Sequence, residues 1–396
     1  MHTLEPVDDT RLNPLVRILT FIARLASAII IPTVAFTVLY LGFIFLRDGD
    51  APKWLITIVA IIWGVGGVAA LYWVFNWIVE LLPDQWTSRL QPFVFVGPAL
   101  AILAWYLAIP TLRTFWISLF GRDGPPNMPL SMFFEDPAAY ISLMAAASVG
   151  LKNYVAVFTD RLMREAFRNN ILFWMLVATP LTVGFGLLVA VLADRSKFER
   201  VAKSLIFMPM AISFVGAGVI WNFMYEVKPV DAPQIGLLNA IVVGLGGQPH
   251  AWTAWTAIAP FNNLFLVVIV LWLQCGFAMV LFSAALKGIP EEHLEAARMD
   301  GATEIQIFFR IMIPSIMGTI ITVSTTIVIF TLKIFDVVWV MTGGQFGTDV
   351  IATQFYRQSF IARNAGYGSA IAVVLLIAVI PVMIYNLRQF RQEEAF

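Results

Sequence analysis

The sequence predicts an all-α, polytopic membrane protein with about eight transmembrane helices. Of its 396 residues, 60% are hydrophobic and only 13% are charged, and the mean hydropathy is +0.82. A soluble domain is nearer half apolar and a quarter charged. The apolar residues form long unbroken runs, and not the ten-residue alternating segments that are typical of a membrane β-barrel. Because so little polar surface is available to face water, we expect lipid to be the solvent of this chain.

Eight stretches reach the roughly 20 apolar residues that a helix needs to cross the hydrocarbon core. The first follows a polar N-terminus and is too long for the apolar part of a cleavable signal, so we expect a spanning helix there. Prolines inside the stretches predict tolerated kinks or points of functional flexing; they are Pro32, Pro98, Pro110, Pro180, Pro209 and Pro381. The stretches are about 25–46, 54–81, 93–120, 170–193, 203–225, 261–286, 315–341 and 367–387.

The distribution of basic residues predicts that both chain termini are cytoplasmic. Short cytoplasmic loops of membrane proteins are enriched in Lys and Arg. The N-terminal side of the expected membrane then carries Arg11, Arg17, Arg24, Arg89, Arg195, Lys197, Arg200, Lys203, Lys287, Arg298, Arg310, Arg388 and Arg391. The short loops of the other side carry Arg47, Lys53, Lys228, Arg357 and Arg363. The long connection 121–169 is left out of the comparison, because long loops cross the membrane largely regardless of their charge.

Two of the expected external connections are long. Gly121–Asn169 contains an amphipathic part, Gly150–Phe167, which predicts a helix lying along the membrane, and Glu226–Pro260 carries two tryptophans. Two interpretations of these connections remain open. Each is either a docking surface for an extracytoplasmic protein or a structured cap on the helices.

The polar connection between the sixth and seventh stretches, residues 287–314, predicts a helix–turn–helix at the cytoplasmic face. Pro290 is suited to a first helical position, and the acidic residues after it would lie at the positive end of the helix dipole. Gly301 supplies the residue that ends the helix and turns the chain. A second, amphipathic helix, about Thr303–Met312, then leads to Pro314 at the next span. The alternative interpretation is an ordinary interfacial hairpin.

The same segment resembles the EAA loop of binding-protein-dependent ABC importer permeases. The matching residues are Glu295, Ala296, Ala297, Asp300, Gly301, Ile311 and Pro314, at the spacing of that motif. Ile313 departs from it, because leucine is usual at this position. The resemblance implies that the loop is a coupling helix, which binds in a cleft of a separate ATPase subunit.

The resemblance covers roughly Pro92–Arg391. It implies a six-helix permease core over residues 92–396, and two additional helices with a cytoplasmic N-terminus over residues 1–91. The stretches that resemble sugar-type permeases are Gly150–Tyr154, Phe167–Asn170 and Lys333–Val338 with Thr342-Gly343-Gly344. The C-terminal region from Gly343 to Gln389 is most similar to α-glucoside permeases. The implied substrate is therefore a sugar, an α-glucoside or another oligosaccharide.

The family resemblance also implies partners and a location. The sequence contains no GxxxxGK[ST] phosphate-binding loop, so ATP and Mg are expected on the partner ATPase and no cofactor on this chain. Implied partners are two ATPase subunits, a second related permease subunit, an extracytoplasmic solute-binding protein that delivers the sugar, and membrane lipid. The implied mechanism is alternating access, and the implied location is a bacterial or archaeal plasma (inner) membrane, crossed several times.

Polar and aromatic residues inside the spans are candidates for the substrate path, because exposing polar groups to lipid is costly. They are Ser213, Asn222, Gln274, Phe277, Thr331, Lys333, Phe335 and Asp336. A sugar binds amide and hydroxyl groups together with aromatic faces, and this set offers both. In the competing interpretation, Lys333 and Asp336 pair on one helix or reach the interface, while Ser213 and Thr331 bond the backbone.

Other function classes receive little support from the sequence. The three histidines His2, His250 and His293 have no metal-ligand spacing, neither HExxH nor GxSxG occurs, and a net charge of zero does not indicate nucleic-acid binding. We therefore expect no enzyme activity and no metal site. The alternative function is an ion-coupled secondary transporter of a small solute, which predicts inverted repeats and buried acids near the membrane midplane.

Overall fold

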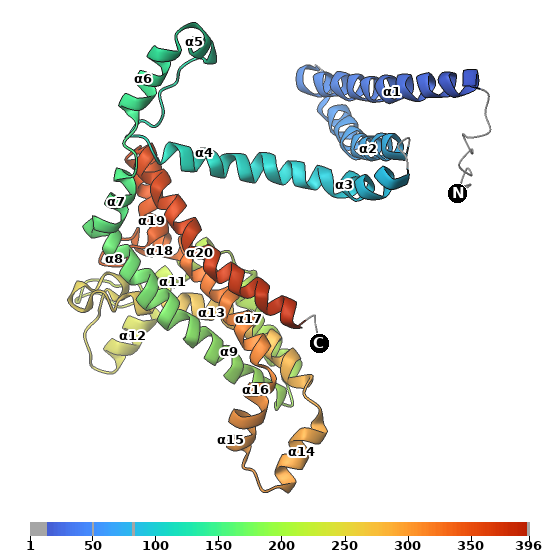
Figure 1. Cartoon of the computed structure of the whole chain (residues 1–396). Helices are drawn as coiled ribbons and strands as arrows, with labels where there is room; N and C mark the ends of the chain where they lie inside the picture. Colours follow the sequence, from blue (N-terminus) through green and yellow to red (C-terminus); the bar gives the residue numbers. More distant parts are fainter. Residues whose placement is uncertain (1–13, 50, 81–83, 394–396) are drawn as a thin grey trace. The chain divides into compact units, whose positions relative to one another are not determined.

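The computed structural model describes residues 14–49, 51–80 and 84–393, and every regular element in these ranges is a helix (Figure 1). The all-α fold class is thereby confirmed. The helices form two compact units, Met1–Thr111 and Leu112–Phe396, here unit 1 and unit 2. The boundary near Pro92, expected between the two additional helices and the permease core, is not tested by this division into units and stays a prediction. The expected cytoplasmic N-terminus, residues 1–13, lies outside the described residues.

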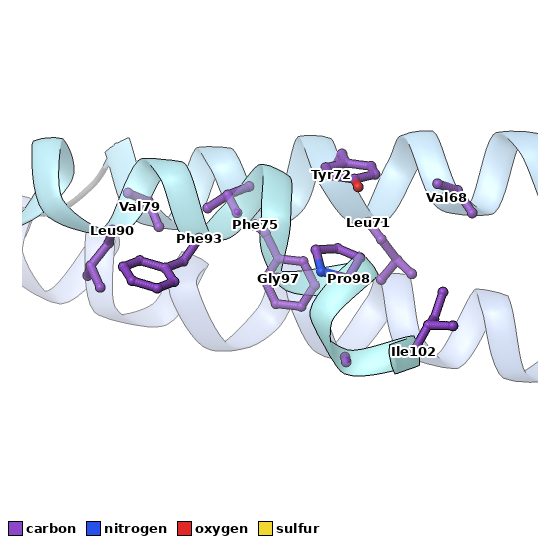
Figure 2. A pocket seen from close by; sticks show the side chains of 12 residues that line it. Val68, Leu71, Tyr72, Phe75, Val79, Leu90, Phe93, Gly97, Pro98 and Ile102 are labelled. Carbon is purple, nitrogen blue, oxygen red and sulfur yellow. The ribbon is translucent and has the colours of Figure 1, made fainter. Parts of the chain in front are cut away.

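Unit 1 consists of long apolar helices, α1 (Pro14–Asp48), α2 (Lys53–Glu80) and α3 (Asp84–Leu103). Between α2 and α3 lies a cavity of about 610 Å³ with apolar walls, which include Leu71, Phe75, Phe93 and Ile102 (Figure 2). The Tyr72 hydroxyl at its edge donates a hydrogen bond of 3.1 Å to the carbonyl of Phe95. Such a lining is compatible with lipid, because its polar group already has a partner.

Helix α3 continues through a π-helical turn, η2 (Ala104–Ala108), into α4 (Ile109–Ile117), within which unit 2 begins at Leu112. The first half of unit 2 contains α5 (Leu130–Glu135), α6 (Pro137–Ala147), α7 (Lys152–Thr159), α8 (Arg161–Asn169), η3 (Asn170–Ala178), α9 (Thr179–Asp194), α10 (Glu199–Phe207), η4 (Met208–Ala211), α11 (Phe214–Met224) and α12 (Leu237–Gly244). The second half contains η5 (Trp252–Ala254), η6 (Thr256–Ile258), α13 (Asn263–Lys287), α14 (Glu291–Met299), α15 (Glu304–Ile307), η7 (Phe308–Met312), α16 (Ile313–Ser315), α17 (Met317–Leu332), α18 (Asp336–Thr342), α19 (Ile351–Tyr356), η8 (Arg357–Ile361) and α20 (Ala365–Glu393).

Helix α13 is the central element of unit 2. It packs along α9 and also contacts α10, α11, α17 and α18, and Leu266, Ile269, Ala278 and Phe282 along its length are fully buried. At 25 residues it is about 37 Å long, which is enough to cross the hydrocarbon core. Its N-terminal end packs near the loop after α18, and its C-terminal end leads into α14 (Figure 1). A group of polar or charged side chains lies at each of these two ends.

The expected eight spans are recovered, two of them in a different form. Among the described residues, six helices are long and apolar enough to cross a membrane, and two bent helix pairs bring the number to eight if each pair is one span. The stretch 203–225, expected as one helix, is α10–η4 and α11 bent by 104°. The stretch 315–341 begins at Ser315, the last residue of α15–α16, which meets α17 at 71°. It breaks again after Leu332. Apolar composition alone does not show such breaks.

Three of the π-helical turns end two residues before a proline. Segments η2, η3 and η7 precede Pro110, Pro180 and Pro314 respectively. Proline has no N–H to donate to the preceding turn, and its ring clashes with the carbonyl four residues back. A locally widened turn accommodates both effects without ending the helix. Among the prolines that were expected to kink or flex the spans, Pro110 and Pro180 therefore coincide with wide turns, and Pro209 lies in the 3₁₀ turn at the 104° bend.

The expected single helix over Gly150–Phe167 is wrong. Helix α7 ends at Thr159 and α8 begins at Arg161, because Asp160 between them has an extended backbone and caps α8. Its carboxylate accepts hydrogen bonds from the N–H groups of Leu162, at 2.7 Å, and Met163, at 3.2 Å. Helix α8 then runs through η3 into α9, so it is the first part of a 34-residue span.

Gly276 gives a direct test of the packing of α13. A Cβ at this position would lie 2.7 Å from both the Ile206 carbonyl oxygen and the Phe207 Cα. These are backbone atoms, so they cannot rotate away. We expect Gly276→Ala to destabilise the protein by about 1–3 kcal/mol, the usual range for overpacking a core. The measurement is the midpoint of thermal unfolding in detergent.

The matched control for this packing test is Gly184→Ala on the neighbouring α9. A Cβ there meets no atom within 4 Å, and alanine favours a helix over glycine. The midpoint of this variant is expected to stay the same or to rise slightly. An unchanged midpoint for Gly276→Ala would show that α13 and α10 are farther apart than described.

Candidate functional site

Residues 287–314, here the docking elbow, project from one end of unit 2 as the helices α14 and α15 (Figure 1). The turn between the helices is built by Gly301, whose φ is +79°, a value that L side chains rarely adopt. Its N–H donates to the carbonyl of Arg298 at 3.0 Å, and the N–H of Ala302 donates to the carbonyl of Ala297 at 3.0 Å. This pair of bonds is the Schellman motif, which satisfies the last carbonyls of a helix. The expected helix end at Gly301 is therefore confirmed.

The second helix of the elbow begins at once. Thr303 caps α15, and the Gln306 side chain accepts a 2.8 Å hydrogen bond from the N–H of Thr303 in return, a capping box. One expectation needs correction at the other side of the turn. Pro290 precedes α14 as its cap and is not its first helical residue, because its ψ of 129° is not helical. Backbone bonds close the end of α14 and the capping box closes the start of α15, so the turn between the two helices has a defined shape.

The surface of the elbow combines small, charged and apolar residues. Glu295 and Ala296 are exposed, while Ala297 is buried against the inside of the elbow. Three large apolar side chains are exposed as well, Met299 by 88%, Ile305 by 71% and Phe309 by 61%. Apolar side chains grouped on a polar projection indicate a surface that another protein covers.

The remaining motif residues lie at the turn and at the base of the elbow. Asp300 is exposed next to Gly301, Ile311 is half-buried, and Pro314 is exposed near the start of α17. Their neighbours Met312 and Ile313 pack against the apolar cluster around Leu286 and Phe282. The structure thus brings the seven predicted motif residues together in one projecting segment, with its base held by apolar packing.

Ion pairs connect the elbow to the end of α9. Glu304, the first residue of α15, accepts hydrogen bonds of 3.0 Å from Arg298 Nε and 3.0 Å from Arg195 Nη2. Arg298 belongs to α14, and Arg195 is the residue directly after α9. The Glu304 carboxylate raises the pKa of the Arg298 guanidinium above its ordinary value. Sequence reasoning did not find this contact, since its partners lie 109 positions apart.

A buried polar network occupies the opposite end of α13 and was also not predicted. Its centre is Asp349, which is 3% exposed. The carboxylate of Asp349 accepts hydrogen bonds from Thr353 and Gln354 and pairs with Arg357 at 3.0 Å. Arg357 also donates to the carbonyl of Gly343 at 2.9 Å. The network therefore fixes the loop 343–350 against α19.

Four buried asparagines extend this network to other helices. Asn169 donates to the carbonyls of Gly347 and Asp349, each at 2.8 Å, and Asn170 accepts a 2.9 Å bond from the N–H of Ile351. Asn262 and Asn263, at the start of α13, donate to the carbonyls of Phe346 and Gly347. The loop 343–350 is thus held by α8 and α13, and η3 holds Ile351, which directly follows the loop. The signal in the sequence was the glycine pattern, since Gly343, Gly344 and Gly347 all have positive φ.

The predicted path residues differ from one another in their burial and in their hydrogen bonds. Gln274 and Phe277 are half-buried on α13, and Asn222 is exposed on α11. Ser213 caps α11, where its hydroxyl accepts a 3.0 Å bond from the N–H of Gly216. Thr331 is fully buried, and its hydroxyl donates to the carbonyl of Val328 at 3.1 Å. Ser213 and Thr331 thus make the backbone bonds that the competing interpretation expected.

The pairing of Lys333 and Asp336 on one helix, which the competing interpretation offered, does not occur. Lys333 caps the end of α17 and Asp336 begins α18, so the helix is interrupted between them. Both side chains are exposed. Phe335 between them stacks on Trp339 with ring centroids 5.7 Å apart, and its ring is also 5.3 Å from that of Tyr356. The interruption therefore places two charged groups beside a cluster of aromatic rings, which apolar composition did not reveal.

Comparisons with known proteins agree on one family. A family model described as the inner membrane component of binding-protein-dependent transport systems matches residues 182–391. The osmoprotective compounds uptake permease protein GgtC of Synechocystis is 50% identical over 76% of this chain and 99% of its own length. The alpha-glucoside transport system permease protein AglF of Rhizobium meliloti is 44% identical over 85% of this chain and 98% of its own length.

The fold is also found among solved structures. A chain in the crystal structure of a bacterial alginate ABC transporter, in complex with an alginate pentasaccharide-bound periplasmic protein, superposes with a TM-score of 0.58. The match covers 76% of this chain and 94% of that chain at 17% identity, so it concerns the fold alone. From the family model and the two relatives it follows that this chain belongs to the binding-protein-dependent transport system inner membrane components, the multi-pass permease subunits of ABC importers.

Proposed function

We propose that this chain is the permease subunit of an ATP-driven importer of a sugar, an α-glucoside or a related glycoside, and that the docking elbow receives a separate ATPase. The observation that carries the proposal is the elbow itself. It is a projection that exposes Glu295 and Ala296 together with Met299 and Ile305. An ATPase bound there can transmit its closure to α13 and α17, since the elbow connects these two helices.

The partners follow from the same proposal. Two ATPase subunits would carry ATP and Mg, and a second related permease would complete the membrane path. An extracytoplasmic binding protein would deliver the sugar to the end of unit 2 opposite the elbow, where residues 121–169 and 226–260 form helical connections (Figure 1). Both termini would then be cytoplasmic, on the side of the elbow.

The substrate class is supported by relatives and by chemistry. AglF is named as an alpha-glucoside permease, and a trehalose/maltose permease of Thermococcus litoralis is 27% identical over 76% of this chain. Sugars present C–H faces to aromatic rings and hydroxyls to polar side chains. The aromatic cluster of Phe335, Trp339 and Tyr356 beside the exposed Lys333 and Asp336 offers both kinds of contact. An ion-coupled secondary transporter, the alternative function, is disfavoured by membership of an ABC importer family.

The proposed function is tested by uptake measurements in membrane vesicles that contain the complete transporter. Radiolabelled maltose, trehalose and sucrose, all α-glucosides, are offered with the binding protein outside and ATP inside. We expect uptake of at least one sugar that stops when ATP is removed. Uptake that persists without ATP, or a purified chain that brings no ATPase with it, would contradict the proposal.

Gln274 is the path candidate that we expect to matter most for uptake. It lies half-buried in the middle of α13, and its amide can bond a sugar hydroxyl. Losing a substrate hydrogen bond costs about 0.5–1.5 kcal/mol, so Gln274→Ala should raise the half-saturating sugar concentration about two- to ten-fold without changing assembly. The control is Thr326→Ala, which removes an exposed hydroxyl bonded to the carbonyl of Thr322. An unchanged half-saturating concentration for Gln274→Ala would remove this residue from the path.

A further inference from the structure

We infer that Glu304 is a positioning residue that joins the docking elbow to α9, so that movement of the elbow is passed to α9 as well as to the two helices that it connects. The inference rests on the proposed function. It concerns a contact outside the seven motif residues. The observation behind it is the Arg195–Glu304–Arg298 bridge, which links three segments that are far apart in the sequence.

The bridge is placed beside the turn of the elbow. Arg298 and Glu304 each lie three residues from Gly301, one on either side. Their hydrogen bond therefore closes the two helices of the elbow on each other, and the bond from Arg195 adds the end of α9 to the same carboxylate. A displacement of the turn is then transmitted to α9 through the side chain of Glu304.

A cavity lies between the elbow and the C-terminal ends of α9 and α13. It measures about 390 Å³, and its walls include Arg195, Lys287, Leu294, Arg298 and Glu304. Apolar packing holds the base of the elbow, where Ile289, Phe308 and Met312 contact the core. The three residues of the bridge belong to the walls of the cavity, and the hydrogen bond from Arg195 to Glu304 makes a direct polar connection between the end of α9 and the elbow there.

The end of α9 is in turn fixed to two other spans. Asp194, the last residue of α9, forms an ion pair with Lys203 of α10 and accepts a 2.7 Å hydrogen bond from Ser283 of α13. Lys203 also pairs with Glu199 at 2.6 Å, and Glu199 with Lys287 at the end of α13. Asp194 and Arg195 are adjacent, so the bridge and this network meet at one point of the chain. The residue pair Asp194–Arg195 is thus a junction between the elbow and three spanning helices.

The exposure of the bridge indicates a role in positioning and not in stability. The side chains of Arg195 and Glu304 are 60% and 52% exposed, and exposed ion pairs contribute little to stability because water and salt screen them. Such a pair can open and re-form during a transport cycle. Its loss should therefore change how well ATP hydrolysis is coupled to transport, and leave folding and ATPase binding as they are.

The test uses vesicles that contain the complete transporter and the α-glucoside that the wild type takes up fastest among maltose, trehalose and sucrose. The quantity measured is sugar transported per ATP hydrolysed. We expect Arg195→Gln, which loses one exposed ion pair, to lower this ratio about two- to five-fold, and Glu304→Gln, which also loses the pair with Arg298, to lower it by at least as much. The double variant should be no worse than Glu304→Gln alone, because the contact that Arg195→Gln removes is already lost in Glu304→Gln. Arg195→Lys keeps the charge and should retain most of the ratio.

The matched control is Asp48→Asn in unit 1. Asp48 pairs with Arg47 at 2.7 Å, with side-chain exposures of 54% and 57%. Asp48→Asn therefore removes an ion pair of the same kind at a position far from the elbow in the sequence. The sugar transported per ATP hydrolysed should not change. The inference would be overturned by an unchanged ratio in Arg195→Gln or Glu304→Gln, by a ratio in the double variant lower than that in Glu304→Gln, or by an equal loss in Asp48→Asn. In each case ATP-driven uptake by the wild type would still stand. Absence of ATP-driven uptake in the wild type would overturn the proposed function, and the role of the bridge with it.

Discussion

Gly301→Pro is expected to separate ATP hydrolysis from sugar uptake. Proline fixes φ near −65° and has no N–H, whereas Gly301 has a φ of +79° and donates to the carbonyl of Arg298. The turn of the elbow must therefore change its shape, and the helices α14 and α15 must change their relative direction. We expect uptake to fall at least about ten-fold, as when a central contact of an interface is lost. Uptake and ATP hydrolysis are measured on the same vesicles.

Glu295→Lys tests the same surface without changing the backbone. Glu295 is exposed on α14, so reversing its charge should weaken or misplace the ATPase and leave the membrane-spanning part folded. Glu80→Lys, an exposed acid at the end of α2, is the control and should transport like the wild type. Gly301→Ala should give a milder defect than Gly301→Pro, because a positive φ is strained but accessible to alanine. Normal ATPase association and uptake in both Glu295→Lys and Gly301→Pro would refute the coupling role of the elbow.

Asp349→Ala is expected to give the largest loss of stability in unit 2. The carboxylate of Asp349 is buried and accepts hydrogen bonds from Thr353, Gln354 and Arg357. Removing one partner of a buried ion pair leaves the other without compensation, at a cost of about 3–5 kcal/mol. Because the Arg357 side chain keeps 30% of its surface exposed, solvent relieves part of this cost, and we expect about 3 kcal/mol.

The measurement for Asp349→Ala is the midpoint of thermal unfolding of the purified protein. Asp349→Asn should cost less, since an amide oxygen can still accept from Thr353. Asp231→Ala removes an exposed acid and should change the free energy of unfolding by less than about 0.5 kcal/mol. If Asp349→Ala melts like the Asp231→Ala control, the buried network does not hold the loop 343–350 in place.

Much of the fold could be predicted because the bilayer imposes simple requirements. A span needs about 20 apolar residues, and stretches such as 54–81 and 261–286 satisfy this with α2 and α13. The elbow could be predicted too, because its turn depends on local chemistry. Gly301 is one of the residues that can adopt the left-handed conformation easily, and the motif around it lies within one segment of the sequence, from Glu295 to Pro314.

The bends and the polar contacts could not be predicted, because they depend on residues that are distant in the sequence. The 71° bend at Ile316 follows Pro314, but a proline in an apolar run also occurs inside unbroken spans such as α20, so it does not by itself predict the bend. The Asn169–Asp349 contact joins positions 180 apart, and the Arg195–Glu304 pair joins positions 109 apart. Polarity alone also could not distinguish Thr331, which is buried and bonded to its own helix, from the half-buried Gln274.

The most direct test of the docking role replaces Met299 with the photoreactive residue p-benzoylphenylalanine and irradiates the complete transporter in membranes. Met299 is 88% exposed next to the turn of the elbow, so a bound ATPase would lie within reach. The account predicts a covalent adduct with an ATPase subunit, identified by mass spectrometry, and none with the same probe at Thr326, an exposed position on α17. Adducts at Met299 that contain no ATPase, or equal ATPase adducts at Thr326, would contradict it.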